Sequence, residues 1–522
     1  MSADRSRSAA FLVGAGIFLS RIAGLVRQKV FAHYFGTSIA ADAFNAAFRI
    51  PNFLQNMFGE GVLSASFIPE YAGLIAREKE EEAGRLAGAV IAALALVSAV
   101  LVLAGVLLAP ALVGTIAPGF SGEKRELTVQ LTRIFFPGAG LLVFSAWCLG
   151  ILNSHRRFFV SYTAPVMWNL VMIGTLLWYG AGTALPRLAQ TLAWASVAGS
   201  ALQFGVQIPF VLGLVKRLRP NLNFRSESFR NVSRTFLPTL VGRGVVQISA
   251  FIDSFIASWL PTGAVATLAY AQVLYTLPVS LFGMAVSAAE LPIMASATGT
   301  MDEISTYLRG RLDGGLERIA FFIIPSVIAF LALGDVVSAA LYESGRFTRS
   351  DSIWIWQILA GSTIGLLAST WGRLYSSTFY ALRDTRTPLR FAVVRVTLNC
   401  VLGYVAALYL PGWLGLNPRW GVAFLTAASG ISGWVEFYLL RREMARRIGK
   451  TSIPAAFTIK LWVAALASAA IGWGFKLGLE GRHTVWIALV ILSSYGLSYL
   501  LITTLIGVPE AVSLTERIRR KL

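Results

Sequence analysis

Charged residues inside long apolar stretches are the part of this sequence that could do chemistry. The first two stretches carry, in order, Arg21, Arg27, Asp42, Arg49 and Glu60. A charged side chain at the centre of a bilayer costs at least about 2.5–3.5 kcal/mol on insertion scales, so such residues face a wet cavity or a partner. Three cations against two acids leave a positive surplus. Because arginine binds phosphate through short, paired, charge-assisted hydrogen bonds, we expect a site for an anionic headgroup here.

These arginines also have a structural interpretation. They can pair with Asp42 and Glu60 and extend toward the lipid headgroups, which leaves no binding role. Arg243, in a later apolar stretch, presents the same choice. It either contacts the anionic headgroup, on the cytoplasmic side of the site, or extends to the cytoplasmic surface of the bilayer.

A second set of charges lies in the second half of the chain, where Glu290, Arg373 and Arg395 fall within apolar stretches. A cation site for Na⁺, or a proton relay, could be formed by Asp253, Asp384, Thr397 and Asn399. An ion pair between Asp253 and Arg395 accounts for the same residues equally well. We therefore expect coupling to Na⁺ or protons and to the membrane potential. The alternative is that these residues only form the ion pair.

The sequence carries no signal of enzymatic or metal chemistry. The segment Gly449-Lys450-Thr451 is similar to the end of a phosphate-binding loop, but Met444 occupies the position of the required first glycine. The three histidines are dispersed without metal-ligand spacing. Cys148 and Cys400 lie in apolar stretches and are expected to be reduced packing thiols. We expect neither an enzyme nor a metal or organic cofactor.

The elements that position these charges must be membrane helices. Of 522 residues 56% are hydrophobic and 14% are charged, and the mean hydropathy is +0.66, which is far outside the range of a soluble domain. The apolar runs are too long for barrel strands, so the fold class is all-α. We predict about fourteen spans, at 10–34, 40–72, 86–114, 128–152, 159–182, 187–215, 236–260, 264–296, 316–341, 352–381, 389–411, 419–440, 455–478 and 483–508.

The position of the basic residues explains the net charge of +19 without nucleic acid. Most of them lie at the N-terminus and in the loops that follow even-numbered spans, and the linker after the sixth span is the richest, with Lys216, Arg217, Arg219, Arg225, Arg230 and Arg234. This asymmetry predicts that both termini are cytoplasmic. No cleavable signal peptide is expected, because Arg21 and Arg27 interrupt the first apolar stretch.

The two halves of the chain carry related motifs. Phe58-Gly59-Glu60-Gly61 followed by Pro69 is matched by Phe282-Gly283 followed by Pro292. We therefore predict two six-helix lobes, at 1–220 and 221–442, with two final spans and a basic tail at 443–522. Because six spans return the chain to its starting side, the repeats should be parallel. Two similar bundles that move about a central site are typical of transporters with alternating access.

Several motifs give the chain a resemblance to a known family. They include Ser20-Arg21-Ile22-Ala23-Gly24-Leu25-Val26-Arg27, Ala41-Asp42-Ala43-Phe44, Phe48-Arg49-Ile50-Pro51-Asn52, Gly59-Glu60-Gly61, Gly150-Ile151-Leu152-Asn153, Ser344-Gly345-Arg346-Phe347-Thr348 and the segment from Phe379 to Pro388. With these motifs the chain closely resembles the MurJ (MviN) lipid II flippases along nearly its whole length.

The resemblance implies a multidrug/oligosaccharidyl-lipid/polysaccharide exporter fold with a central cavity and a groove for the lipid tail along the last two spans. It implies lipid II, the undecaprenyl-diphosphate-linked peptidoglycan precursor, as substrate, with membrane lipids and cell-wall synthesis proteins as partners. By matched position, it also implies that Arg21, Arg27, Asp42, Arg49 and Glu60 line the cavity.

The chain departs from the family pattern at two positions. Gln55-Asn56 and Gln272-Val273 stand where the family often has basic residues. We hypothesise that Arg243 supplies the charge that Val273 does not. Three rival functions remain: a flippase for another polyprenyl-diphosphate sugar, a drug/cation antiporter, and a non-transporting scaffold. An antiporter would be expected to have an acidic first lobe.

Overall fold

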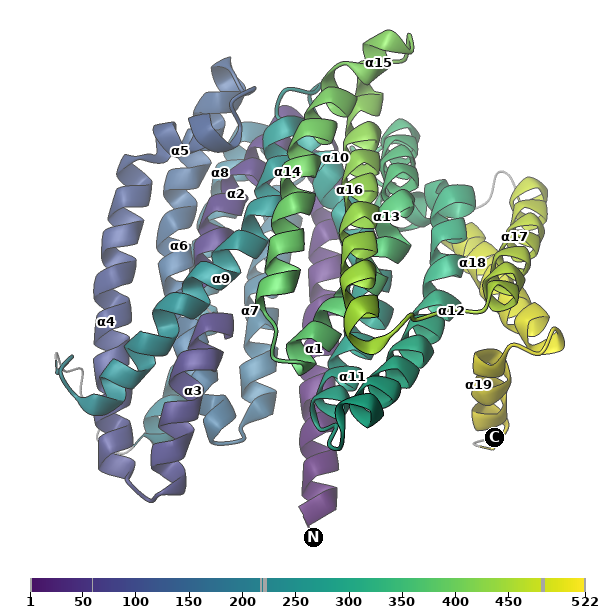
Figure 1. The fold of residues 1–522 in the computed structure, drawn as a ribbon. Coiled ribbons are helices and arrows are strands. Elements are labelled where there is room, and N and C mark those ends of the chain that lie inside the picture. Colours follow the sequence, from purple (N-terminus) through teal and green to yellow (C-terminus); the bar gives the residue numbers. More distant parts are fainter. Residues whose placement is uncertain (1, 59, 216–217, 219–222, 480–483, 521–522) are drawn as a thin grey trace. The chain divides into compact units, whose positions relative to one another are not determined.

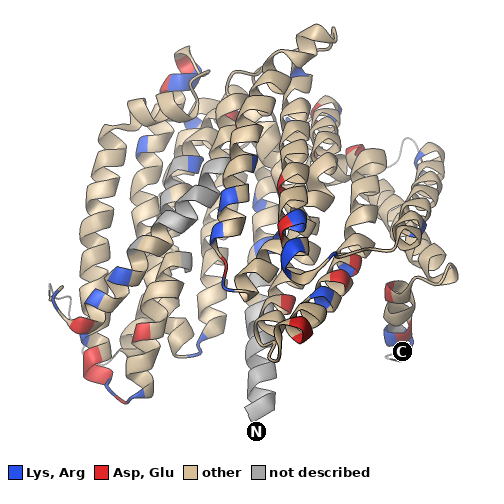
Figure 2. Ribbon diagram, viewed as in Figure 1, with Lys and Arg blue, Asp and Glu red and all other residues tan. Residues whose placement is uncertain are grey.

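The computed structural model describes residues 2–58, 60–215, 218, 223–479 and 484–520 (Figure 1). Within these residues every regular element is a helix, and the only extended pairing is an isolated bridge between Ser344 and Phe347. The predicted all-α membrane fold is confirmed. Figure 2 shows long helical stretches without Lys, Arg, Asp or Glu, and charged residues partway along several helices.

Eleven helices in the described part of the chain are long and apolar enough to cross a membrane. They cover eleven of the predicted spans. The other three predicted spans coincide with α1, with the pair α2 and α3, and with α9, which are not among the eleven. Helices thus occur at every predicted span, while a count of fourteen membrane crossings stays a prediction.

The chain divides into two compact units, Met1–Ala266 and Thr267–Leu522. The first unit contains α1 (Ser2–Phe35), α2 (Ile39–Phe58), α3 (Glu60–Ala76), α4 (Glu80–Leu107), α5 (Ala109–Ile116), α6 (Gly122–Ser154), α7 (Phe158–Tyr179), α8 (Leu185–Leu214) and α9 (Glu227–Ala257). Helix α6 is its centre, and it packs on α2, α3, α4 and α8. Helix α9, which the sequence placed in the second lobe, packs on α2 and α3 of this unit. The predicted repeat itself stays a prediction.

The helix α10 (Ala264–Pro278) begins at the end of the first unit and continues into the second. Pro278 is followed by a π-helical turn, η1 (Val279–Met284), and then by α11 (Ala285–Ala295). Proline lacks the backbone donor that a regular helix needs, so an interruption at this position is expected.

The rest of the second unit consists of α12 (Met301–Tyr342), α13 (Arg349–Ala381), α14 (Arg386–Leu408), α15 (Leu410–Trp413), η2 (Pro418–Trp420), α16 (Gly421–Ile448), α17 (Ala455–Gly478), α18 (Thr484–Leu505) and α19 (Pro509–Arg519). Helix α16 packs against both α13 and α14. A Cβ at Gly365 of α13 would lie 2.4 Å from the Cα of Gly430 of α16. Only glycines allow two backbones to approach so closely, which fixes the register of the two helices.

The charged first part of α12 binds α11. The carboxylate of Glu290, which is buried, accepts hydrogen bonds from Arg311 Nε at 2.8 Å and from Arg318 Nη1 at 3.0 Å. Both donors lie in the charged first part of α12. Glu290 is therefore a structural residue that joins two helices, since its charge is balanced by these arginines.

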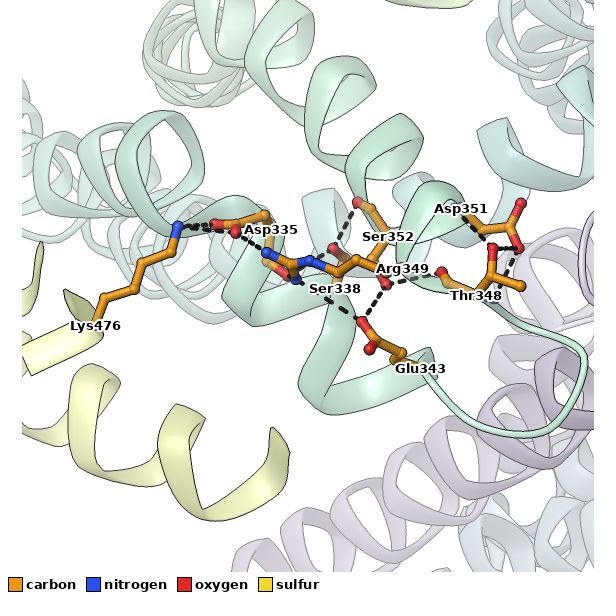
Figure 3. Close-up of polar contacts among 8 residues, drawn as sticks. All are labelled: Asp335, Ser338, Glu343, Thr348, Arg349, Asp351, Ser352 and Lys476. Carbon is orange, nitrogen blue, oxygen red and sulfur yellow. Dashed lines mark hydrogen bonds and ion pairs between the residues drawn. The ribbon is translucent and has the colours of Figure 1, made fainter. Parts of the chain in front are cut away.

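The last two long helices are attached to α12 by polar contacts. Asp335 of α12 accepts from Lys476 of α17 at 2.8 Å and is paired with Arg349 of α13 (Figure 3). On α18, the hydroxyl of Tyr499 donates to the carbonyl of Phe321 at 2.8 Å. That carbonyl has no amide partner four residues later, because Pro325 stands there.

Removal of the tyrosine hydroxyl should loosen α18. We expect Tyr499→Phe to leave the carbonyl of Phe321 unsatisfied, at a cost of about 1–3 kcal/mol. Protease accessibility of the C-terminal helices in purified protein should rise. Tyr438→Phe, which changes a more exposed tyrosine (62%), is the control. Equal protease sensitivity of the two variants would refute this role for the hydroxyl.

Candidate functional site

The first helical hairpin brings three arginines to a similar depth. Counted from the linked ends of α1 and α2, Arg27, Arg49 and Arg21 lie about 12, 15 and 21 Å along their helices at the helical rise. These depths lie well inside roughly 30 Å of hydrocarbon. The three arginines thus lie at membrane depth on adjoining elements of the first unit, and their convergence on one site stays a prediction.

Arg27 is held by two uncharged side chains of α7. Its Nε donates to Oδ1 of Asn169 at 3.0 Å, and its guanidinium lies over the ring of Trp168 at 5.0 Å. The amide of Asn169 is itself oriented, since its Nδ2 donates to the carbonyl of Pro165 at 3.1 Å. Neither contact brings a negative charge to the arginine. Such contacts fix the direction of the guanidinium and keep its planar donors ordered.

An aromatic block connects Arg27 to α2. The indole of Trp168 donates to the carbonyl of Ser196 at 3.1 Å, and its ring stacks on Phe48 at 5.8 Å between centroids. Phe48 packs edge-on against Phe135 at 5.3 Å and precedes Arg49 in the sequence. Side chains from α2, α6, α7 and α8 therefore support the arginines, and each aromatic pair adds about 0.5–1.5 kcal/mol beyond its buried area.

Arg49 and Arg21 differ in their surroundings. Arg49 is half-buried and lies within the electrostatic field of Asp253, on α9. Arg21 is exposed, and among the residues that the structure describes it makes no hydrogen bond or ion pair. An exposed guanidinium at this depth is available to an incoming anion, because no carboxylate of the described residues occupies its donors.

Asp42 lies away from any open surface. It is fully buried, its carboxylate is paired with Lys124 of α6 at 2.5 Å, and it accepts from the amides of Gly263 at 2.7 Å and Ala266 at 2.8 Å. Carboxylates at helix N-termini satisfy unpaired amides in this way. In this structure Asp42 therefore ties α2 and α6 to the start of α10, and its expected place in the lining of a cavity stays a prediction.

Breaking this buried pair should unfold the protein more easily. We expect Asp42→Asn to lower the free energy of unfolding by about 3–5 kcal/mol, because it leaves the charge of Lys124 without its partner. Thermal unfolding of purified protein measures the effect. The double variant Asp42→Asn with Lys124→Met should recover part of the loss, since no charge then remains. An unchanged unfolding temperature for Asp42→Asn would show that the pair is not structural.

Two predicted substrate contacts lie outside the described side chains. Glu60 begins α3 and Arg243 lies in α9, but nothing further is described of either side chain. Their roles stay predictions, including the idea that Arg243 compensates for Val273. Gln55 likewise falls in a part of α2 whose side chains are not described.

The residues of the predicted cation site are not gathered in the second unit. The carboxylate of Asp384 accepts from the amides of Arg386 and Thr387 at the start of α14, and it pairs with Arg447 at 2.7 Å. Hydrogen bonds from Thr387, and then from Arg447 and Arg386, lower the pKa of Asp384 to about 2. This carboxyl group is therefore ionised at physiological pH, and its part in cation coupling stays a prediction.

The other predicted ligands lie further along α14. Thr397 is exposed and Asn399 is buried, and Asn399 is about 20 Å from the first residue of that helix at the helical rise. Arg395 pairs with Glu436 at 3.2 Å. Among the described residues no group of three His, Cys, Asp or Glu side chains could hold a metal ion. Cation coupling stays a prediction.

Sequence reasoning missed the neutral partners of the arginines. Asn169 and Trp168 lie 142 and 141 positions from Arg27 and occur in an ordinary apolar helix, so nothing in the local sequence identifies them as its partners. Nor does the sequence indicate that Lys124 pairs with Asp42. The capping role of Asp384 could have been predicted from the sequence, since an acid just before a helix that contains Thr387 and Pro388 is a typical N-terminal cap.

Comparison with known proteins shows that the chain is similar to one family along most of its length. The family model described as lipid II flippase MurJ matches residues 31–492. A probable lipid II flippase MurJ of Rhizobium meliloti is 32% identical over 439 residues, covering 82% of this chain and 78% of that protein. A probable lipid II flippase MurJ of Haemophilus influenzae is 30% identical, and the match covers 87% of this chain and 90% of that protein.

Solved structures agree with this match. A lipid II flippase MurJ in an inward closed conformation has a TM-score of 0.76 and 25% identity, and the match covers 95% of this chain and 98% of that one. An inward-facing multidrug resistance MATE family transporter of the MOP superfamily has a TM-score of 0.65 at 17% identity over 82% of this chain and 96% of its own. The second likeness concerns the fold alone.

Proposed function

Because the chain belongs to the MurJ lipid II flippase family, we propose that it moves lipid II from the cytoplasmic to the periplasmic leaflet of a bacterial inner membrane. The proposed process is transport by alternating access and converts no covalent bond. The observation that carries the proposal is the set of arginines at membrane depth in the first unit, within a chain that matches this family along most of its length.

The geometry supports a phosphate-bearing substrate. Arg21 is exposed without a described partner, and Arg27 is oriented by uncharged side chains. Guanidinium groups keep their charge and offer two parallel donors to a phosphate. The diphosphate of lipid II is such a group, and its transfer through hydrocarbon requires that its charge be balanced on the way.

Orientation, coupling and partners belong to the same proposal. The basic loops support cytoplasmic termini by the positive-inside rule. The membrane potential, with Na⁺ or protons as a further source, is proposed to drive transport. Besides lipid II itself, membrane lipids and cell-wall synthesis proteins are proposed partners.

Complementation tests the proposal against its rivals. This gene should sustain growth and cell shape in a bacterium whose own essential lipid II flippase is depleted, because the substrate is the same. A flippase for another polyprenyl-diphosphate sugar, an antiporter or a scaffold would not sustain growth. Lysis upon depletion, with this protein present in the membrane at normal level, would contradict the proposal.

A further inference from the structure

A second set of arginines at membrane depth lies in the second unit. Arg373 is on α13, Arg395 on α14 and Glu436 on α16, the helix that packs against both of the others. Counted from the end of α13, the start of α14 and the end of α16, these residues lie about 12, 14 and 18 Å along their helices. The three side chains therefore belong to one level of the unit, inside the hydrocarbon.

The acid neutralises only one of the two cations. Arg395 Nη1 pairs with Oε2 of Glu436 at 3.2 Å, and both side chains are largely covered, with exposed fractions of 33% and 14%. Arg373 is exposed, and within the described residues it makes no hydrogen bond or ion pair. It nevertheless lies within the electrostatic field of Arg395 and Glu436. The cluster therefore keeps a net positive charge on its open side.

Two tyrosines add hydroxyl groups around Arg373. Tyr275 and Tyr380 both interact electrostatically with it. The hydroxyl of Tyr275 is hydrogen-bonded to Oγ of Ser369 at 3.0 Å, one helical turn before Arg373. Tyr380 is 46% exposed. Because the close approach of Gly365 and Gly430 fixes α13 against α16, the surroundings of Arg373 are held in place before any ligand arrives.

We propose that Arg373 is the anchor of an anion-binding site on the second unit that takes a phosphate group of a lipid-linked substrate. An arginine without a partner at this depth is costly, and a phosphate would offset that cost through paired, charge-assisted hydrogen bonds. Glu436 keeps Arg395 in position, and the exposed tyrosine hydroxyl offers a further donor. The inference rests on the proposed function only in taking the phosphate to be the diphosphate of the transported lipid.

Binding of undecaprenyl diphosphate to the purified, full-length protein tests the site. We expect Arg373→Gln to weaken binding about tenfold or more, as loss of a hydrogen bond between charged groups does. Arg373→Lys should recover part, because it keeps the charge but not the planar fork. Arg390→Gln, a change of an exposed arginine on α14, is the matched control and should bind as the wild type does. Inorganic pyrophosphate should compete, and phosphatidylglycerol should not.

Several results would overturn the inference. Unchanged affinity of Arg373→Gln would mean that the arginine only extends to the bilayer surface. Competition by phosphatidylglycerol as strong as that by pyrophosphate would identify a site for ordinary lipid headgroups. If the glutamine variant does not fold, the lysine variant decides, and full affinity there contradicts a need for the two-pronged donor. Each of these results would contradict the anion site while the wild-type protein still complements the depleted strain. If the proposed function is wrong, the wild-type protein itself fails to complement.

Discussion

Replacement of any one arginine of the first hairpin by alanine should abolish complementation. Arg21→Ala, Arg27→Ala and Arg49→Ala each remove a cation that we propose balances the diphosphate at membrane depth. A hydrogen bond to a charged group is worth about 1.5–3 kcal/mol, and more is lost where water is scarce, so transport should fall at least about tenfold. Growth of the depletion strain and the amount of membrane-inserted protein are measured together.

Lysine at the same three positions separates geometry from charge. Because lysine keeps the charge but loses the planar pair of donors, Arg27→Lys should recover only part of the activity. The loss should be largest there, since Asn169 and Trp168 orient the guanidinium plane. Arg77→Ala, an exposed arginine between α3 and α4, is the control and should grow normally. Normal growth of all three alanine variants would contradict the anionic site.

Collapse of the membrane potential should stall transport. Movement of a diphosphate outward carries negative charge toward the positive side of the membrane, and about 100 mV, inside negative, favours this by about 2.3 kcal/mol per charge. Because the substrate carries more than one negative charge, we expect the loss of transport to be large. Exposure of lipid II is followed after addition of an ionophore that removes the potential alone. A second ionophore that removes only the pH gradient is the control.

The potential experiment also bears on cation coupling. Unchanged exposure of lipid II after loss of the potential would contradict the electrical account. Hydrogen bonds from Thr387 and Arg447 lower the pKa of Asp384 to about 2, so this carboxylate is charged at neutral pH. Dependence of transport on the pH gradient would support coupling to protons.

The arginines could be predicted from the sequence because their cost in hydrocarbon makes them conspicuous. Their depth also followed, since a helix rises by a fixed amount per residue. The membrane helices could be predicted from apolar runs alone. The interruption after Pro278 followed from the missing backbone donor of proline.

The partners of these charges could not be predicted. Asp42 meets Lys124 82 positions away and Gly263 221 positions away, and sequence spacing carries no information on such contacts. For the same reason Asn169 could not be predicted as the partner of Arg27. The burial and the ion pair of Asp42 are likewise known only from the structure.

The amount of lipid II at the outer leaflet tests most directly whether this chain transports lipid II. Cells depleted of their own flippase and supplied with this protein are treated with an enzyme that cleaves only lipid II on the outer surface. We predict cleavage at the level of undepleted cells, and loss of cleavage for Arg21→Ala at equal protein abundance. Lipid II that stays protected in cells with normal amounts of the wild-type protein would contradict lipid II transport by this chain.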